Sequence, residues 1–196
     1  MKVIGITGGV GCGKSAVLSQ LEKTLNCVVL RADEAAMELE QKGQDCYDSL
    51  VNLLGREVLN EDGQINRNKM AVMVFDNDKL LEEVNNIVHP AVKKYILEQI
   101  DKTKKKGKVD FFFLEAALLI ECGYNSIVDE MWYIFANKDI RIKRLKESRN
   151  YSEQKIESIM DSQLSEEEYR KNSDFVVDNS NSLEDSINQI CKRIEA

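Results

Sequence analysis

The chain has 196 residues but only one proline and one histidine, and it has no excess of positive charge. The single histidine, His89, excludes metal sites that are built from several histidines. The single proline, Pro90, excludes proline-rich linkers and recognition tracts. A formal net charge of −7 gives no general basic field that would attract nucleic acid or an anionic membrane. An anionic substrate must therefore be held by a few local cations.

Cysteine pairs and long apolar runs are also missing. The five cysteines include no Cys-x-x-Cys pair, and their odd number argues against a disulfide framework. No apolar run approaches the length of a membrane-spanning helix, and the N-terminus has no secretory signal pattern. We therefore expect a cytoplasmic protein with reduced thiols and with neither nucleic acid nor a membrane as its partner.

Short apolar runs alternate with helical patterns along the chain, which is typical of a parallel α/β sheet with right-handed crossovers. The runs are continuously apolar, as in strands that are buried on both faces. The predicted strands span residues 3–6, 27–30, 109–114, 131–135 and 175–177. The predicted helices span residues 14–25, 80–88, 92–100, 140–147, 153–160 and 183–194.

A phosphate-binding pattern follows the first predicted strand. Residues 8–15, GGVGCGKS, match G-x-x-x-x-G-K-[ST], in which glycines let backbone N–H groups close around phosphate oxygens. Lys14 would reach the β- and γ-phosphates, and the Ser15 hydroxyl would bind Mg²⁺. The strand before the motif and the amphipathic helix after it provide the context that a nucleotide-binding loop requires.

Other motifs narrow the class of nucleotide enzyme. The sequence Asn137-Lys138-Asp139 has its aspartate one position too early for the guanine motif N-K-x-D, and a D-x-x-G switch element is missing. We interpret these three residues as the turn and cap that open the next helix. A large mechanical ATPase does not fit a chain of this length, so a small kinase remains.

Asp33 is a candidate for the group that accepts the proton of the substrate hydroxyl. It follows the second predicted strand, and ligands of open α/β sheets lie beyond the carboxyl ends of the strands. The same position would suit an N-cap for a helix that starts at Glu34. The residues alone leave both interpretations open.

A cationic helical segment could close over the transferred phosphate. Arg144 and Arg149 are five residues apart, which places them about 140° apart on one continuous helix. Both can reach one triphosphate only if the helix ends near residues 148–150, and Ser152 would suit the N-cap of a following helix. An exposed helix with mixed charges is the alternative.

In order and spacing, these elements resemble the dephospho-CoA kinase family over nearly the whole chain. The first matching elements are the phosphate loop at residues 7–15 and Ala32-Asp33. They continue with D-G-x-[LI]-x-R at 62–67, L-E-x-x-x-x-I-x-H-P at 81–90, a variant of P-L-L-x-E at 117–121, K-R-L-x-x-x-R at 143–149, Gln163, and V-[VI]-D-N at 176–179.

The resemblance implies a P-loop NTPase three-layer α/β fold with a five-stranded parallel sheet, a helical substrate-binding insertion and a helical lid. It implies a nucleotide-binding core at residues 1–35, 105–140 and 174–196, a dephospho-CoA domain at 36–104 and a lid at 141–173. The long helical stretch between the second and third predicted strands supports the insertion. We expect Pro90 in the first turn of the helix that continues to residue 100.

The activity implied is transfer of the ATP γ-phosphate to the 3′-hydroxyl of dephospho-CoA, the last step of coenzyme A synthesis. Asp33 would be the general base, Lys14, Arg144 and Arg149 would contact phosphates, and Asn179 would lie near adenine. The implied ATP-binding residues are Gly9, Gly11, Cys12, Gly13, Lys14, Ser15, Ala16 and Asn179, and the implied substrate-binding residues are Asp33, Arg67, Phe75 and His89. Mg²⁺ would be required, with Ser15 as its protein ligand.

Two alternatives remain open, a P-loop kinase for another nucleoside, nucleotide or small metabolite, and a non-catalytic regulator that binds ATP. Several positions also depart from the family pattern. Cys12 and Ala16 stand where serine and threonine are usual in the loop, and Ala117 replaces a proline. Arg31 and Met37 stand where aspartate and arginine are common. The departures leave Lys14, Ser15, Asp33, Arg144 and Arg149 in place.

Overall fold

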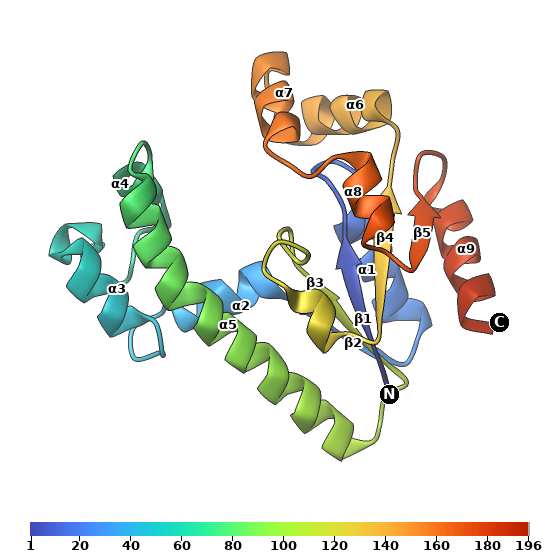
Figure 1. Ribbon diagram of the computed structural model, residues 1–196, viewed down its shortest axis with the longest axis horizontal. Helices are drawn as coiled ribbons and strands as arrows, with labels where there is room; N and C mark the ends of the chain where they lie inside the picture. Colours follow the sequence, from blue (N-terminus) through green and yellow to red (C-terminus); the bar gives the residue numbers. More distant parts are fainter. Residues whose placement is uncertain (196) are drawn as a thin grey trace. The chain divides into compact units, whose positions relative to one another are not determined.

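A five-stranded parallel sheet with strand order β2-β3-β1-β4-β5 forms the centre of the nucleotide-loop part of the chain (Figure 1). The computed structural model describes residues 1–195. The chain divides into two compact units: a core unit, from Met1 to Leu30 and from Thr103 onward, and an insertion unit, Arg31–Lys102. The strands are β1 Lys2–Thr7, β2 Cys27–Arg31, β3 Phe111–Glu115, β4 Glu130–Phe135 and β5 Phe175–Asp178.

The predicted fold class and all five predicted strands are confirmed, with differences at strand ends and in the burial of the edge strands. The third strand begins at Phe111, two residues later than predicted. The Asp110 N–H donates instead to the carbonyl of Asn26, a residue that precedes β2 and lies outside the sheet. The strand β2 is only half-buried along its whole length, since it lies at the edge of the sheet. Complete burial on both faces was therefore wrong for this strand.

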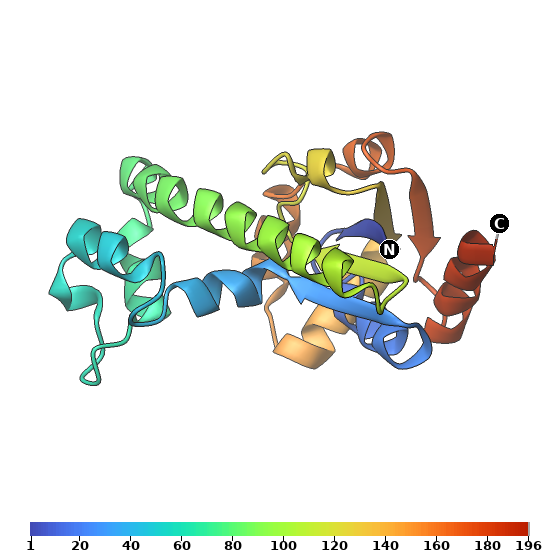
Figure 2. The same cartoon turned by 90° about the horizontal axis from the view of Figure 1, so that it is seen from below.

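Two helices cover one face of the sheet, α1 (Lys14–Thr24) and α9 (Leu183–Glu195) (Figure 2). The residues Val17, Leu18 and Leu21 of α1 pack against buried strand side chains, among them Ile4 and Trp132. Each such aliphatic side chain contributes roughly 1.5–3 kcal/mol when it is fully buried. This packing fixes the helix that begins at the phosphate-binding loop.

A short 3₁₀ helix, Tyr124–Ile127, lies between β3 and β4. The other three helices that lie wholly in the described core unit follow β4 and precede β5. They are α6 Lys138–Arg149, α7 Glu153–Asp161 and the short α8 Glu166–Lys171. The break predicted after Arg149 is confirmed: Asn150 has φ +54°, and the Ser152 hydroxyl accepts the Lys155 N–H at 3.3 Å. Asn137 lies at the N-cap position of α6 as predicted, although its side chain makes no capping hydrogen bond.

The insertion unit is helical, as expected. It contains α2 Ala32–Leu39, α3 Tyr47–Leu54, a 3₁₀ turn at Arg56–Val58, α4 Arg67–Val74 and most of α5 Asp78–Lys106. The helix α2 begins at Ala32 with Arg31 at its N-cap position, so the interpretation of Asp33 as an N-cap is wrong. Asp33 instead lies exposed in the first turn of that helix.

One continuous helix, α5, replaces the two that the sequence predicted on either side of Pro90. The proline lies in its interior and not in a first turn, so the carbonyl four residues earlier loses its helical partner, which typically costs about 3 kcal/mol. Buried residues on both sides of the proline, including Val84, Val92 and Ile96, share one apolar face. Packing of that face keeps the helix continuous.

Candidate active site

The phosphate-binding loop connects the C-terminal end of β1 to α1. Its conformation depends on close approaches that glycine alone permits. Gly13 has φ +93°, and a Cβ there would collide with the side-chain nitrogen of Asn179. Gly8 has φ +148°, and a Cβ there would collide with the Ile134 carbonyl oxygen. The motif glycines are therefore required by the packing of this loop as well as by its dihedral angles.

Three cations donate to alternate carbonyl groups of the loop. The Lys14 Nζ lies 2.6 Å from the Gly8 oxygen, the Arg141 Nε lies 2.8 Å from the Val10 oxygen, and the Arg144 Nη1 lies 3.3 Å from the Cys12 oxygen. The backbone N–H groups of Gly11, Gly13, Lys14 and Ser15 have no acceptor within residues 1–195. Unpaired N–H groups at a helix N-terminus are suited to bind an anion.

Asn179, which follows β5, bonds the phosphate-binding loop through its side chain. Its side chain is buried, its Nδ2 donates to the Cys12 carbonyl at 2.8 Å, and its Oδ1 accepts the Ser186 hydroxyl at 2.8 Å. The Asn179 carbonyl in turn accepts the Arg144 Nη2 at 2.9 Å. The structure therefore brings Arg144 and Asn179, two residues singled out by the sequence, to the same point of the loop.

The Cys12 side chain faces the interior, because it is only 1% exposed and belongs to the hydrophobic cluster that includes Val17 and Ile134. Its thiol is therefore shielded from solvent, although it lies within the phosphate-binding motif. The cysteine places a weakly polar thiol, and not a hydroxyl, among these apolar side chains.

Two residues near the loop were missed as site residues by sequence reasoning. Glu115 ends β3, and its Oε1 lies 4.0 Å from the Lys14 Nζ. The signal was a carboxylate directly after an apolar strand, but the predicted strand ended one residue too early. Arg141 lies in the cationic helical segment, but only Arg144 and Arg149 of that segment were singled out.

Arg149 does not join the loop contacts. It ends α6 with an exposed side chain, and its guanidinium lies 5.9 Å from the centre of the Tyr151 ring. Ser15 and Ala16 lie exposed on the first turn of α1. The Ser15 hydroxyl is therefore open to a ligand that approaches this turn.

The substrate-binding residues predicted in the insertion unit lie on different helices. Arg67 begins α4, Phe75 follows its end with 76% of its surface exposed, and His89 is half-buried on α5. The Arg67 Nε lies 3.0 Å from the Oε2 of Glu40, a carboxylate that is almost completely buried. Burial raises the pKa of Glu40, and the charge of Arg67 opposes that rise.

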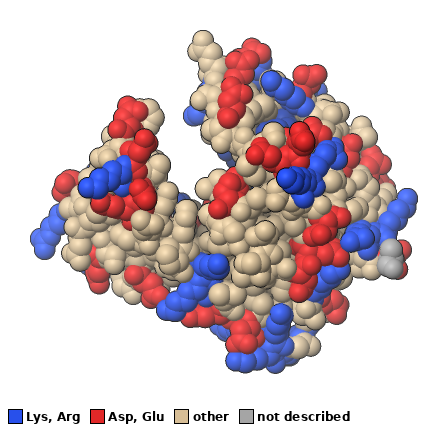
Figure 3. Space-filling model, viewed as in Figure 1, with Lys and Arg blue, Asp and Glu red and all other residues tan. Residues whose placement is uncertain are grey.

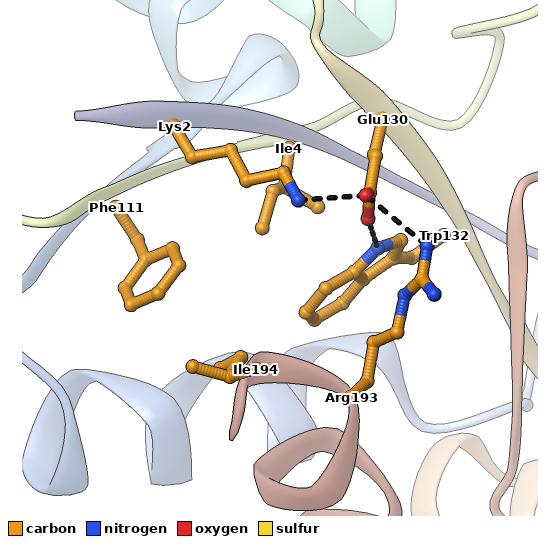
Figure 4. Close-up of a pocket in the computed structure, with 7 residues that line it drawn as sticks. All are labelled: Lys2, Ile4, Phe111, Glu130, Trp132, Arg193 and Ile194. Atoms are coloured by element: carbon orange, nitrogen blue, oxygen red, sulfur yellow. Dashed lines mark hydrogen bonds and ion pairs between the residues drawn. The ribbon is translucent and has the colours of Figure 1, made fainter. Parts of the chain in front are cut away.

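A cavity of about 240 Å³ lies at the N-terminal ends of β1 and β4, the end of the sheet opposite the loop (Figure 4). Glu130 accepts from Lys2 at 2.6 Å, Trp132 at 2.8 Å and Arg193 at 3.1 Å. Burial alone would raise the pKa of Glu130, but these hydrogen bonds and the charges of Lys2 and Arg193 outweigh burial and lower it. The charged groups satisfy one another, so we interpret this network as an anchor between α9 and the sheet.

A family model described as dephospho-CoA kinase matches residues 2–185. A dephospho-CoA kinase from Carboxydothermus hydrogenoformans is 34% identical over 190 residues, which cover 97% of this chain and 91% of that protein. Another from Aquifex aeolicus is 36% identical over 195 residues, which cover 100% of this chain and 97% of that protein. The predicted family resemblance is therefore confirmed.

Solved structures agree with this result. A crystal structure from Thermus thermophilus has a TM-score of 0.84 at 27% identity and covers 99% of this chain and 96% of its own. A dephospho-CoA kinase from Campylobacter jejuni has a TM-score of 0.73 at 26% identity, and the match covers 100% of this chain and 96% of that chain. A shikimate kinase from Acinetobacter baumannii, at 12% identity and a TM-score of 0.56, shares the fold. The chain belongs to the dephospho-CoA kinase family of P-loop kinases.

Proposed function

We propose that this chain transfers the γ-phosphate of ATP to the 3′-hydroxyl of dephospho-CoA, which gives CoA and ADP. The observation that carries the proposal is the phosphate loop, with unpaired N–H groups and three cations around it, in a chain of this family. Phosphoryl transfer needs positioning and charge stabilisation and no covalent enzyme intermediate. The loop supplies both for the donor.

On the ATP side, the N–H groups of Gly11, Gly13, Lys14 and Ser15 would hold the phosphates, together with Gly9, Cys12 and Ala16 of the same loop. Lys14 is within reach of an incoming phosphate, because its present acceptor is a carbonyl of the loop itself. Arg144 would stabilise the negative charge that spreads over the transferred group. Asn179 would support the loop and lie beside the adenine.

The residues near the loop fit a Mg²⁺ ion. The exposed Ser15 hydroxyl and the Glu115 carboxylate are oxygen donors, which this ion prefers. Within the described residues no group of three or more His, Cys, Asp or Glu could hold a metal, so ATP phosphates and water would complete the coordination. When bound, the ion neutralises charge on the β- and γ-phosphate oxygens.

On the acceptor side, Asp33 would accept the proton of the 3′-hydroxyl. Its exposed position in the first turn of α2 leaves the carboxylate open to a ligand. Arg67, Phe75 and His89 would hold dephospho-CoA in a substrate domain at residues 36–104. The segment 141–173 would act as a lid, with Arg149 moving toward the phosphates when it closes.

We also propose a cytoplasmic location. All five cysteines are free, which suits a reducing compartment. Among residues 1–195, no helix combines the length and the apolar character that crossing a bilayer would require. On the face drawn in Figure 3, Lys and Arg side chains are interspersed with Asp and Glu and form no continuous basic surface. This pattern supports small anions, not nucleic acid, as the ligands.

A coupled assay of ADP release tests the proposed acceptor. Dephospho-CoA, AMP, CMP and shikimate are compared at equal concentration with Mg²⁺ and ATP, and Lys14→Ala protein serves as the control for contaminating kinases. We expect a much higher kcat/KM for dephospho-CoA than for the other three. Equal rates with all acceptors, or a preference for AMP, CMP or shikimate, would overturn the proposed substrate.

A further inference from the structure

The backbone of Val10, at the tip of the phosphate loop, is held by two side chains from outside the motif. The Val10 N–H donates to the Oε1 of Gln163 at 2.9 Å, and the Val10 carbonyl accepts the Arg141 Nε at 2.8 Å. Arg141 also donates through Nη2 to the same Gln163 oxygen at 3.2 Å. Both polar groups of the Val10 backbone are therefore fixed by residues more than a hundred positions away in the sequence.

The fit between this pair and the loop is close. A Cβ on Gly9 would lie 3.0 Å from the Gln163 Oε1 and would collide with the Arg141 guanidinium. Gly9 has no positive φ, so its lack of a side chain is explained by this contact and not by its dihedral angles. Two residues later in the loop, a Cβ on Gly11 would lie 3.0 Å from the carbonyl oxygen of Arg141.

The chain segment that follows Gln163 is anchored by two local contacts. It lies in the connection between α7 and α8, and the start of α8 is fixed by a capping box between Ser165 and Glu168. Tyr169 of α8 stacks on Tyr133 of β4, with ring centres 4.9 Å apart and planes 12° apart. The helix that follows Gln163 is thus anchored on the sheet that carries the loop.

We propose that Arg141 and Gln163 are positioning residues that keep the backbone of Val10, with the peptide groups on both sides of it, in its phosphate-binding orientation. The pair directs the Val10 carbonyl away from the anion site, where it would repel phosphate oxygens. The N–H groups that follow, from Gly11 onward, then face the phosphates. This role rests on the proposed binding of ATP by the loop, but it does not depend on which acceptor is phosphorylated.

The decisive variants are Gln163→Ala and Gln163→Met. Both remove the hydrogen-bond acceptor, but methionine keeps most of the length and volume of the side chain. We expect each to raise the Kd for ATP, measured by calorimetry without any acceptor, by roughly tenfold. The melting temperature and the KM for dephospho-CoA should change little. Gln154→Ala, on the exposed surface of α7, is the matched control and should bind ATP like the unmodified protein.

Two further measurements complete the test. Gly9→Ala leaves Gln163 and Arg141 intact but displaces them, and it should weaken ATP binding to a similar degree. Arg141→Ala combined with Gln163→Ala should cost less than the product of the two single effects, because both side chains hold the backbone of Val10 and bond each other. ATP binding restored by methionine, or independent multiplicative effects of the two substitutions, would show that the pair only packs the lid and would overturn the proposal. Loss of acceptor selectivity with these ATP effects intact would overturn only the proposed substrate.

Discussion

The phosphate loop and the insertion unit carry residues of the same proposed reaction, but they differ in how completely those residues are fixed. Around the loop, Lys14, Arg144 and Asn179 each have a partner in the loop itself within 3.3 Å. In the insertion unit, Asp33 and Phe75 are exposed. Three residues of the proposed donor site are therefore fixed by contacts within the fold, whereas Asp33 and Phe75 of the proposed acceptor site are open to a ligand.

This difference has an electrostatic cause. A triphosphate is small and highly charged, so preorganised N–H groups and cations provide most of its stabilisation. Dephospho-CoA is larger, and exposed apolar and charged side chains can form contacts with it as it binds. Substitutions at the loop should therefore affect ATP binding and turnover together, whereas substitutions in the insertion unit should separate the two.

The largest effect is expected from Lys14→Ala. Loss of the cation that we propose contacts the β- and γ-phosphates should reduce kcat/KM by about 10³-fold. Steady-state kinetics with varied ATP measure this loss, and Lys23→Ala, at the exposed end of the same helix, serves as the control. A loss below about tenfold would show that the N–H groups bind ATP without this lysine.

Asp33→Asn should lower kcat by about a hundredfold, because the side chain keeps its shape but no longer accepts a proton. The affinity for ATP, measured by calorimetry, should stay the same. Glu34→Gln, one residue later in the exposed first turn of α2, is the matched control. An unchanged kcat would remove Asp33 from the role of general base, and a weaker ATP affinity would place it on the donor side.

The two arginines of α6 offer a comparison within one helix. Arg144→Ala removes two hydrogen bonds to the loop region, and it should weaken ATP binding about tenfold and lower the melting temperature. Arg149→Ala removes no contact with the loop, so it should lower kcat by a similar factor with ATP affinity and melting temperature unchanged. A stability defect without loss of turnover for Arg149→Ala would support an exposed structural helix instead of a lid.

The sequence predicted the parts of this protein that depend on local patterns. Apolar runs located all five strands, and the loop motif located Lys14 and Ser15, because glycine spacing and helix context are encoded within a few residues. The contacts of Arg141 and Gln163 with Val10 were not predictable in this way, since they join segments that only the folded chain brings together. The continuous helix through Pro90 also required knowledge of its buried face.

The smallest expected effect concerns Glu40, where the insertion unit does contain a fixed charge pair. Burial raises the pKa of this carboxyl from its ordinary value of 4.5, so the folded state holds the proton more tightly than the unfolded state does. The stability that comes from this proton is fully present below pH 4.5 and is lost as the pH rises through the folded-state pKa. Glu40→Gln should remove this loss and become more stable relative to the unmodified protein as the pH rises.

Urea denaturation at pH 4.5 and pH 7.5 measures the difference, with Glu61→Gln in an exposed turn as the control. Arg67 is half exposed, so the loss of its ionic partner should cost only about 0.5 kcal/mol. Suppose instead that Glu40→Gln loses stability relative to the unmodified protein as the pH rises from 4.5 to 7.5. The attraction between Glu40 and Arg67 then outweighs the cost of burying the charged carboxylate. In that case the insertion unit, like the loop, would hold one of its predicted ligand-binding cations in place before the ligand binds.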